Sequence, residues 1–148
     1  MPALTIDLFG VKPQLALSDN ISYRGKYSGD DLPNHLTKGW GLVWDGHSLQ
    51  CCNGQYGIYQ QINSPHKASL FLAARIPVIV WQRSAIKNFV VHNRLGISVT
   101  SLFDIDEKIN ALGESQINDI QKQLDLWSAR IRIGYFLQKA LNFIEGQL

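Results

Sequence analysis

The alternation of short apolar runs with helical segments constrains the fold of this chain more than any other feature of its sequence. Short apolar runs that end at glycine or at polar turn residues are typical of strands. The predicted strands cover residues 4–9, 21–23, 41–44, 77–81 and 97–99. Strands that alternate with helices favour a mostly parallel sheet covered by helices on both faces. We therefore predict an α/β fold.

Helices are predicted between these strands, and serines mark where they begin. The predicted helices cover residues 28–36, 64–74, 84–93 and 101–112. Two of them begin with the spacing of a capping box, Ser28 with Asp31 and Ser101 with Asp104. The other two begin at serines that can act as N-caps, Ser64 and Ser84, and Pro65 then takes the first helical position.

The chain continues as helix from Glu114 to its end. Its apolar residues form one stripe of Leu124, Trp127 and Ile131 and a second stripe of Leu137, Leu141 and Ile144. Gly134 lies between the two stripes and predicts a break between two helices. We expect the aromatic residues of these helices to pack in the domain's own core, or else to form a surface for a partner. These aromatic residues are Trp127, Tyr135, Phe136 and Phe143.

Composition limits the classes of protein to which the chain can belong. A chain of 148 residues with 45% hydrophobic residues is sufficient for one globular domain with a single core. A formal charge of +2 without a dense basic run disfavours nucleic acid as a partner. No apolar run approaches the roughly 20 residues that a membrane span needs, and adjacent Cys51 and Cys52 give no sign of an oxidising compartment. We expect a cytoplasmic protein that is not integral to a membrane.

Ligands of parallel sheets bind outside the carboxyl ends of the strands. The loops after Phe9, Tyr23, Trp44 and Trp81 are therefore predicted to lie on the ligand side. The loop from Asp45 to about Tyr59 is long for a compact domain, and long loops are often functional.

The predicted helix start at residues 63–67 is the strongest chemical feature of the sequence. The N-terminus of a helix attracts anions through its free amides and its dipole, and Lys67 adds a full positive charge in the first turn. A lysine there opposes the dipole unless an anion such as a pyrophosphate lies between the two. His66 could donate a hydrogen bond to a phosphate or act as an acid or base. A solvated lysine and a packing or capping histidine are the alternatives.

The order of several motifs resembles the C-terminal half of certain bacterial glycosyltransferases. The matching segments are 41–46, Tyr59, 63–67, 69–73, 76–80, 96–97 and 101–102. Their most specific parts are the Trp-Asp-Gly turn at 44–46 and the Pro-His-Lys helix start at 65–67. The family comprises two-domain enzymes of the GT-B type. It includes galactofuranosyltransferase-like proteins of surface polysaccharide clusters and the third glucosyltransferase that acts on serine-rich streptococcal adhesins.

This resemblance implies that the whole chain, residues 1–148, is a Rossmann-like nucleotide-sugar-binding domain, a single half of a GT-B fold whose N-terminal acceptor domain is absent. The implied fold is a parallel sheet of about five or six strands with helices on both faces and C-terminal helices. The implied function is to bind a nucleoside-diphosphate sugar, with a UDP-sugar expected, for transfer of a hexose to a glycan or glycoprotein. The implied partners are the donor and either an N-terminal half or a second copy bound through the C-terminal helices.

The resemblance also implies roles for individual residues. Lys67 would contact the pyrophosphate. The rest of the implied nucleotide-sugar site consists of Asn63, Ser64 and His66 along the pocket and of Tyr59, Asp45 and Gly46 in its loop wall. Enzymes of this type stabilise the leaving diphosphate with helix dipoles and basic side chains, so neither a metal nor a further cofactor is expected.

The chain departs from the family pattern at two places. Arg75 stands where family members commonly have glycine, which predicts a strained turn, a different helix end or an additional cation at the site. Residues 62–70 contain no carboxylate, so the glutamate that holds the ribose in many GT-B enzymes has no counterpart there.

The sequence gives weaker support to other sites and functions. Asp7 and Asp45 end predicted strands as in a receiver domain, but the paired acids and the lysine of that fold are absent. His47, Cys51, Cys52 and His66 do not have the spacing of metal ligands. No Gly-x-Gly-x-x-Gly motif follows the first predicted strand, which disfavours a dinucleotide fold. The alternative to a donor domain is a noncatalytic nucleotide-binding or oligomerisation module.

Overall fold

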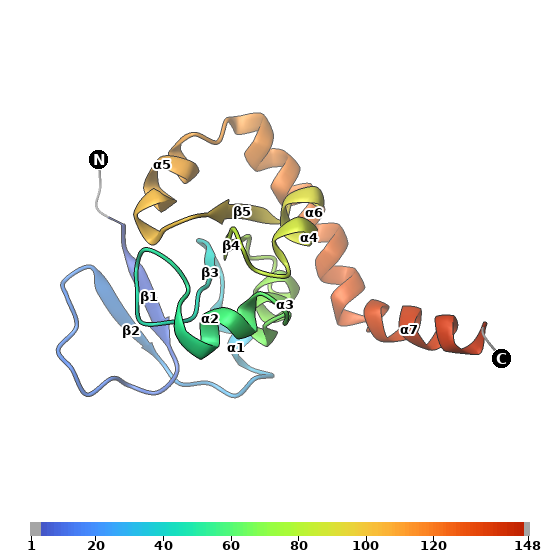
Figure 1. Ribbon diagram of the computed structural model, residues 1–148, viewed down its shortest axis with the longest axis horizontal. Helices are drawn as coiled ribbons and strands as arrows, with labels where there is room; N and C mark the ends of the chain where they lie inside the picture. Colours follow the sequence, from blue (N-terminus) through green and yellow to red (C-terminus); the bar gives the residue numbers. More distant parts are fainter. Residues whose placement is uncertain (1–3, 147–148) are drawn as a thin grey trace. The chain divides into compact units, whose positions relative to one another are not determined.

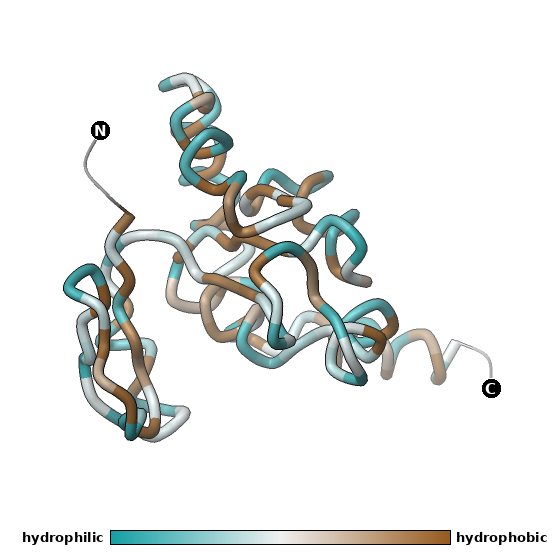
Figure 2. Tube along the Cα trace, turned by 60° about the vertical axis from the view of Figure 1, so that its left-hand side comes forward, coloured by the Kyte–Doolittle hydropathy of each residue, from teal (hydrophilic) through white to brown (hydrophobic). Residues whose placement is uncertain are grey.

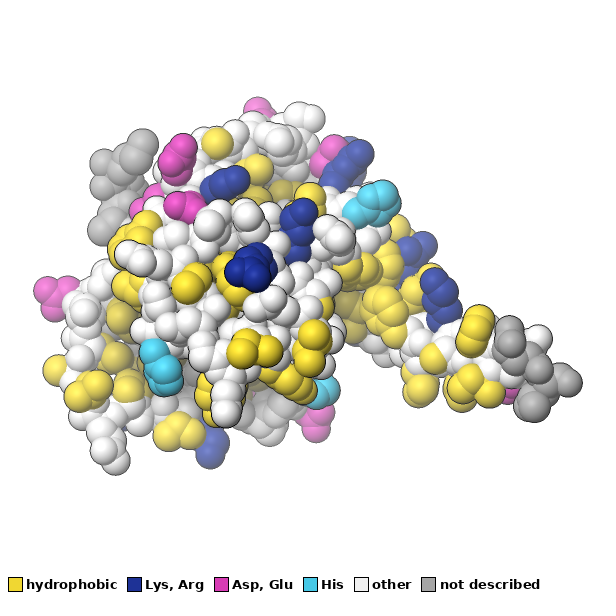
Figure 3. Space-filling view, viewed as in Figure 1, with side chains coloured by type: hydrophobic (Ala, Val, Ile, Leu, Met, Phe, Trp, Pro, Cys, Tyr) yellow, Lys and Arg dark blue, Asp and Glu magenta, His cyan; other side chains and the backbone are white. Residues whose placement is uncertain are grey.

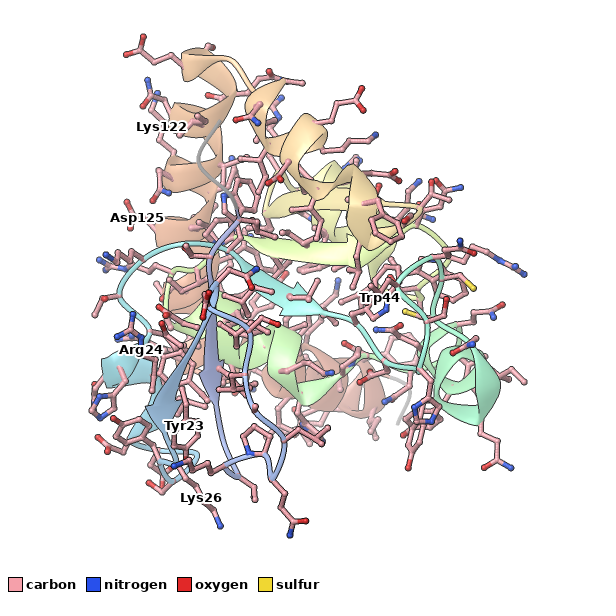
Figure 4. The ribbon with its side chains drawn as sticks, turned by 90° about the vertical axis from the view of Figure 1, so that its left-hand side faces the viewer. Tyr23, Arg24, Lys26, Trp44, Lys122 and Asp125 are labelled. Atoms are coloured by element: carbon pink, nitrogen blue, oxygen red, sulfur yellow. The ribbon has the colours of Figure 1, made fainter. Side chains whose placement is uncertain are left out.

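The computed structural model describes residues 4–146, which divide into an N-terminal unit up to Leu36 and a C-terminal unit from Thr37 onward. The N-terminal unit contains two parallel strands, β1 (Ile6–Phe9) and β2 (Ile21–Gly25), followed by the single-turn helix α1 (Leu32–His35). Arg24 on β2 forms an ion pair of 2.7 Å with Asp7 on β1 (Figure 4).

The C-terminal unit is built on a three-stranded parallel sheet in the order β3 (Gly41–Val43), β4 (Val78–Trp81), β5 (Gly96–Val99) (Figure 1). The helices before β5 are α2 (Gly54–Gln60), α3 (His66–Ala73) and α4 (Lys87–His92). After β5 come the 3-10 turn η1 (Leu102–Asp104) and the helices α5 (Ile105–Asn110), α6 (Glu114–Arg132) and α7 (Tyr135–Glu145). None of the helices within residues 4–146 is both long and apolar enough to cross a membrane.

Helices cover both faces of this sheet, as predicted. Every residue of β4 is buried, and successive residues of a strand point to opposite faces. Val78 and Val80 join a core with α3, α4 and α6, to which Leu124 and Trp127 of the predicted α6 stripe contribute. Ile79 joins a second core that includes Val99 of β5 and Ile105 of α5.

The predicted single sheet of about five or six strands is wrong. The larger sheet has three strands, and β1 and β2 pair with each other in a separate sheet. A strand inside a sheet covered on both faces needs apolar residues at every position, as in β4. The residues of β1 and β2 are exposed or half-buried, with alternation along β2, which suits a small sheet of its own.

Several predicted helix starts need correction. The predicted loop from Asp45 to Tyr59 ends earlier, because α2 begins at Gly54. Ser64 does not cap α3, since Pro65 is its N-cap and the helix begins at His66. The other errors are that Ser84 does not cap α4, whose N-cap is Ile86, and that the helix after Ser28 is only the turn from Leu32 to His35.

Other predictions about helix ends are confirmed. The Ser101 hydroxyl accepts the amide of Phe103 at 3.1 Å, and the Asp104 carboxylate accepts the amide of Ser101 at 3.0 Å, which forms the predicted capping box. The break at Gly134 separates α6 from α7. The predicted second stripe of Leu137, Leu141 and Ile144 lies exposed on α7.

Two arginines occupy the left-handed conformation that usually requires glycine, Arg75 with a φ of 61° and Arg94 with a φ of 54°. After α3, the Ile76 amide bonds to the Phe71 carbonyl and the Arg75 amide to the Leu72 carbonyl, which is the Schellman pattern. The side chain of Arg75 lies 3.4 Å from Asp125 of α6, and that of Arg94 lies 3.1 Å from Asp119 of α6.

We predict that Arg75→Gly raises the free energy of unfolding in urea by about 1 kcal/mol, because glycine adopts a positive φ without strain. The lost ion pair offsets little of this gain, since both of its side chains are about two-thirds exposed. Arg75→Ala, which loses the pair but keeps the strain, is the control and should leave stability nearly unchanged or slightly lower. Equal stability of the two variants would contradict the explanation.

Candidate functional site

Lys67 lies in the first turn of α3 at the carboxyl edge of the three-stranded sheet. The chain runs from the end of β3 through α2 and α3 into β4, and β3 and β4 are parallel. A helix in such a crossover runs back across the sheet, so α3 begins at the edge where β3 ends. The ε-ammonium group of Lys67 donates to the Asp45 carboxylate at 2.6 Å and to the Trp44 carbonyl at 3.2 Å.

The N-terminus of α3 gives this lysine an unusual setting. The N-cap is Pro65, whose side chain offers no oxygen to the amides of the first turn. The positive charge of Lys67 is unfavourable beside the positive end of the helix dipole. The negative charge of the Asp45 carboxylate, which is paired with Lys67, compensates for this repulsion. Both side chains of this pair are about one-third exposed, so solvent reaches the charges.

The loop of residues 45–53 is anchored near the end of β3 and near the end of β5. Trp44 directly precedes this loop (Figure 4). Gly46 has a φ of 128°, and Asn53 fills the space that a β-carbon there would need. The Asn53 side chain also accepts the His47 amide at 3.0 Å. Farther along, the Leu49 carbonyl accepts the amide of Leu102, which follows β5, at 2.8 Å. The loop therefore joins the ends of β3 and β5.

Cys52 is buried within this loop, whereas Cys51 is exposed. Burial raises the pKa of the Cys52 thiol, and a hydrogen bond with the Asp45 backbone partly offsets that effect. The charges of Asp45 and Lys67 also act on this pKa, in opposite directions. Cys52 is thus bonded to the backbone of Asp45, the residue that pairs with Lys67.

Two buried polar residues near the ends of β3 and β4 were not predicted as part of a site. The Gln60 side chain is 1% exposed and donates to the Val43 carbonyl at 3.2 Å, and the backbone carbonyl of Gln60 accepts the Ala85 amide at 3.0 Å. The Gln60 Oε1 and Ser84 Oγ atoms are buried and have no hydrogen-bond partner within residues 4–146. Nothing in the local sequence distinguishes Gln60 from other glutamines, and the sequence predicts Ser84 to be a helix cap.

The structure brings some of the predicted site residues together. Asp45 and Lys67 are in contact, and the Asn63 amide donates to the Tyr59 carbonyl at 2.9 Å. Ser64 and His66 flank the start of α3 with exposed side chains, and Gly46 is exposed in the loop. Tyr59 is 58% exposed at the end of α2.

Other candidate groups lie elsewhere or do not assemble. Arg75 follows the C-terminal end of α3, opposite to Lys67, so the hypothesis that it supplies a second cation to this site is wrong. Within the part of the chain that the structure describes, no three His, Cys, Asp or Glu side chains gather as metal ligands would.

Comparison with known proteins assigns the chain to a family. The family described as glucosyltransferase 3-like, C-terminal domain, matches residues 1–144. The chain belongs to this family. The Trp-Asp-Gly and Pro-His-Lys motifs indicated a bacterial glycosyltransferase family, and this prediction is therefore confirmed.

Curated relatives of the family are named as glycosyltransferases. The chain is 32% identical over 143 residues to the beta-1,6-galactofuranosyltransferase WbbI of Escherichia coli (strain K12), covering 95% of this chain and 43% of that protein. It is 29% identical over 140 residues to glucosyltransferase 3 of Streptococcus gordonii, covering 94% of this chain and 41% of that protein. The chain is thus a glycosyltransferase-type domain that spans less than half the length of these curated relatives.

We predict that a thiol reagent at pH 8 modifies Cys51 in the folded protein and reaches Cys52 only on unfolding. The pKa of Cys52 is raised in the folded state, so the unfolded thiol ionises first as the pH rises past the ordinary value of 9.0. The free energy of unfolding should therefore fall with rising pH in that range, and it should fall less in Cys52→Ala. Equal labelling rates of the two thiols in the folded protein would contradict the burial of Cys52.

Proposed function

We propose that the chain is the donor-binding domain of a glycosyltransferase. The proposed ligand is a nucleoside-diphosphate sugar, with a UDP-sugar as the expected donor, and the reaction transfers a hexose to a glycan or glycoprotein acceptor. Membership of the glucosyltransferase 3-like family supports the reaction class. The choice of UDP rests on resemblance to that family.

The observation that carries this proposal is the position of Lys67 in the first turn of α3, beside the end of β3. The amides and dipole of a helix N-terminus favour an anion, and the ammonium group adds a full charge to the same place. Negative charge develops on the diphosphate as its bond to the sugar breaks. Fixed positive groups at that place stabilise the transition state and the leaving group.

The neighbouring residues have proposed roles that follow from their positions. Asn63, Ser64 and His66 surround the start of α3 and would supply hydrogen bonds to the phosphates or the sugar. Tyr59 at the end of α2 presents an exposed aromatic face, which suits stacking against a base or a sugar ring. Asp45 and Gly46 would form the loop wall of the proposed site on the side of β3.

The matched relatives are more than twice as long as this chain. We propose that the domain acts as the donor half of a GT-B architecture, with the acceptor bound by an N-terminal half. Lys67 and the residues around the start of α3 would then bind the donor and stabilise its leaving group. Groups that activate the acceptor would come from the other half.

A second candidate is a noncatalytic module that assembles through α7. This helix extends from the end of α6 (Figure 1), and hydrophobic residues recur along it (Figure 2). Their side chains lie open on its surface (Figure 3). The exposed apolar residues of this region include Ile133, Phe136, Leu137, Leu141, Phe143 and Ile144. Among the aromatic residues of this region, Trp127 is buried and stacks on Phe136 with ring centroids 5.9 Å apart, whereas Phe136 and Phe143 are 51% and 69% exposed.

Calorimetric titration of the domain with UDP tests the donor-binding proposal. We expect saturable binding that Lys67→Ala weakens by about tenfold or more, because the variant removes a charge-assisted contact to phosphate. Lys122→Ala on α6 is the matched control and should bind like the original chain. GDP is the comparison ligand and should bind more weakly. Equal affinities of the Lys67→Ala and Lys122→Ala variants would contradict the proposal.

Light scattering on a sizing column tests the second candidate. If α7 drives assembly, the mass should exceed that of a monomer, and Leu137→Glu should return it to the monomer because the charge lies on the exposed face. Lys67→Ala should not change the mass. A monomer in all three samples would reject self-assembly through α7.

A further inference from the structure

We propose that Asp45 competes with the ligand for Lys67, and that a diphosphate binds this lysine only after the Asp45 carboxylate has left it. This inference rests on the proposed function, because it concerns the same anion site. It assigns to Asp45 the role of setting how much negative charge a ligand must carry to enter. Asp45 is thus a residue that determines specificity.

The geometry of Lys67 supports this competition. An ammonium group has three N–H donors, and here one is directed at the Asp45 carboxylate and another at the Trp44 carbonyl. The contact with Asp45 is short, at 2.6 Å, as expected for an ion pair with a shared hydrogen bond. A phosphate oxygen that approaches Lys67 therefore meets a lysine whose charge is already balanced.

The carboxylate also resists the ligand directly. An anion at the start of α3 would lie near Asp45 as well as near Lys67, and like charges at such distances repel strongly where solvent is partly excluded. A monovalent anion carries no more charge than the Asp45 carboxylate, and the backbone already holds that carboxylate beside the lysine. A monovalent anion therefore does not displace it. A diphosphate brings more charge and can satisfy both Lys67 and the amides of the helix.

The surrounding structure lets the carboxylate leave while the loop stays in place. The loop backbone is held by the contact of Gly46 with Asn53 and by the bond from Leu102 to Leu49. The Asp45 side chain is 34% exposed, so rotation about its own bonds can turn the carboxylate toward water. Release of Lys67 therefore requires movement of one side chain only.

A set of five variants tests the competition, with UDP and inorganic pyrophosphate as the probes in calorimetric titrations. Asp45→Asn should bind both probes about tenfold more tightly than the original chain, because it removes the competing charge and keeps the shape. In the background of Lys67→Ala, the same change should tighten binding clearly less than it does in the original chain, because no lysine remains to be released and only the direct repulsion by the carboxylate is removed. Asp106→Asn on α5 is the control for net charge and should bind like the original chain. Asp45→Ala provides a second removal of the carboxylate in case Asp45→Asn folds poorly.

The outcomes separate this inference from the proposed function. If the original chain binds UDP through Lys67 but Asp45→Asn and Asp45→Ala bind no more tightly, Asp45 merely positions the lysine and the inference fails while the function stands. A full gain from Asp45→Asn in the Lys67→Ala background also overturns the inference, since the effect is then one of general charge. Tighter binding of pyrophosphate without any binding of UDP supports the competition and rejects the nucleotide donor. Failure of every variant to bind either probe overturns both.

Discussion

Burial of β4 on both faces is the constraint on which the C-terminal unit depends. A strand whose four residues are all buried must have a strand on each side and helices above and below. β3 and β5 provide the neighbours, α3, α4 and α6 cover one face, and α5 covers the other. The parallel crossover from β3 to β4 then places the start of α3 at the carboxyl edge, where Lys67 meets Asp45. The site is a consequence of this topology.

The packing of α6 strengthens the same arrangement. Its buried side chains Leu124 and Trp127 fill the core under α3 and α4. Its polar side chains hold the opposite end of α3, since the Ser128 hydroxyl and the Arg132 side chain both donate to the Ala73 carbonyl, at 2.8 Å and 3.0 Å. The helix that carries Lys67 is thus fixed at its C-terminal end, which lies opposite to the proposed ligand site.

Much of the C-terminal unit could be predicted from the sequence, because its strongest signals are local. The apolar run at 77–81 predicts the buried strand β4, and the spacing of Ser101 and Asp104 predicts the capping box that these two residues form. α2 could not be predicted, because Gly54 and Gly57 are poor helix formers. A tertiary contact holds that helix, since the buried Gln60 side chain in its last turn donates to the Val43 carbonyl of β3. The pairing of β1 with β2 in a separate sheet depends in the same way on contacts that no local pattern encodes.

The candidate site could be predicted only in part, because some of its contacts join residues that lie far apart in the sequence. The helix start at Lys67 and the turn at Asp45 could be recognised as motifs, but their ion pair joins residues 22 positions apart. Gln60, which bonds to the end of β3 from the last turn of α2, is an ordinary glutamine in the sequence. The central claim is that a nucleoside diphosphate binds at the start of α3, and backbone amide shifts on titration with UDP measure this most directly. The account predicts the largest shifts at Asp45, His66 and Lys67, and shifts confined to α4 or α7 would contradict it.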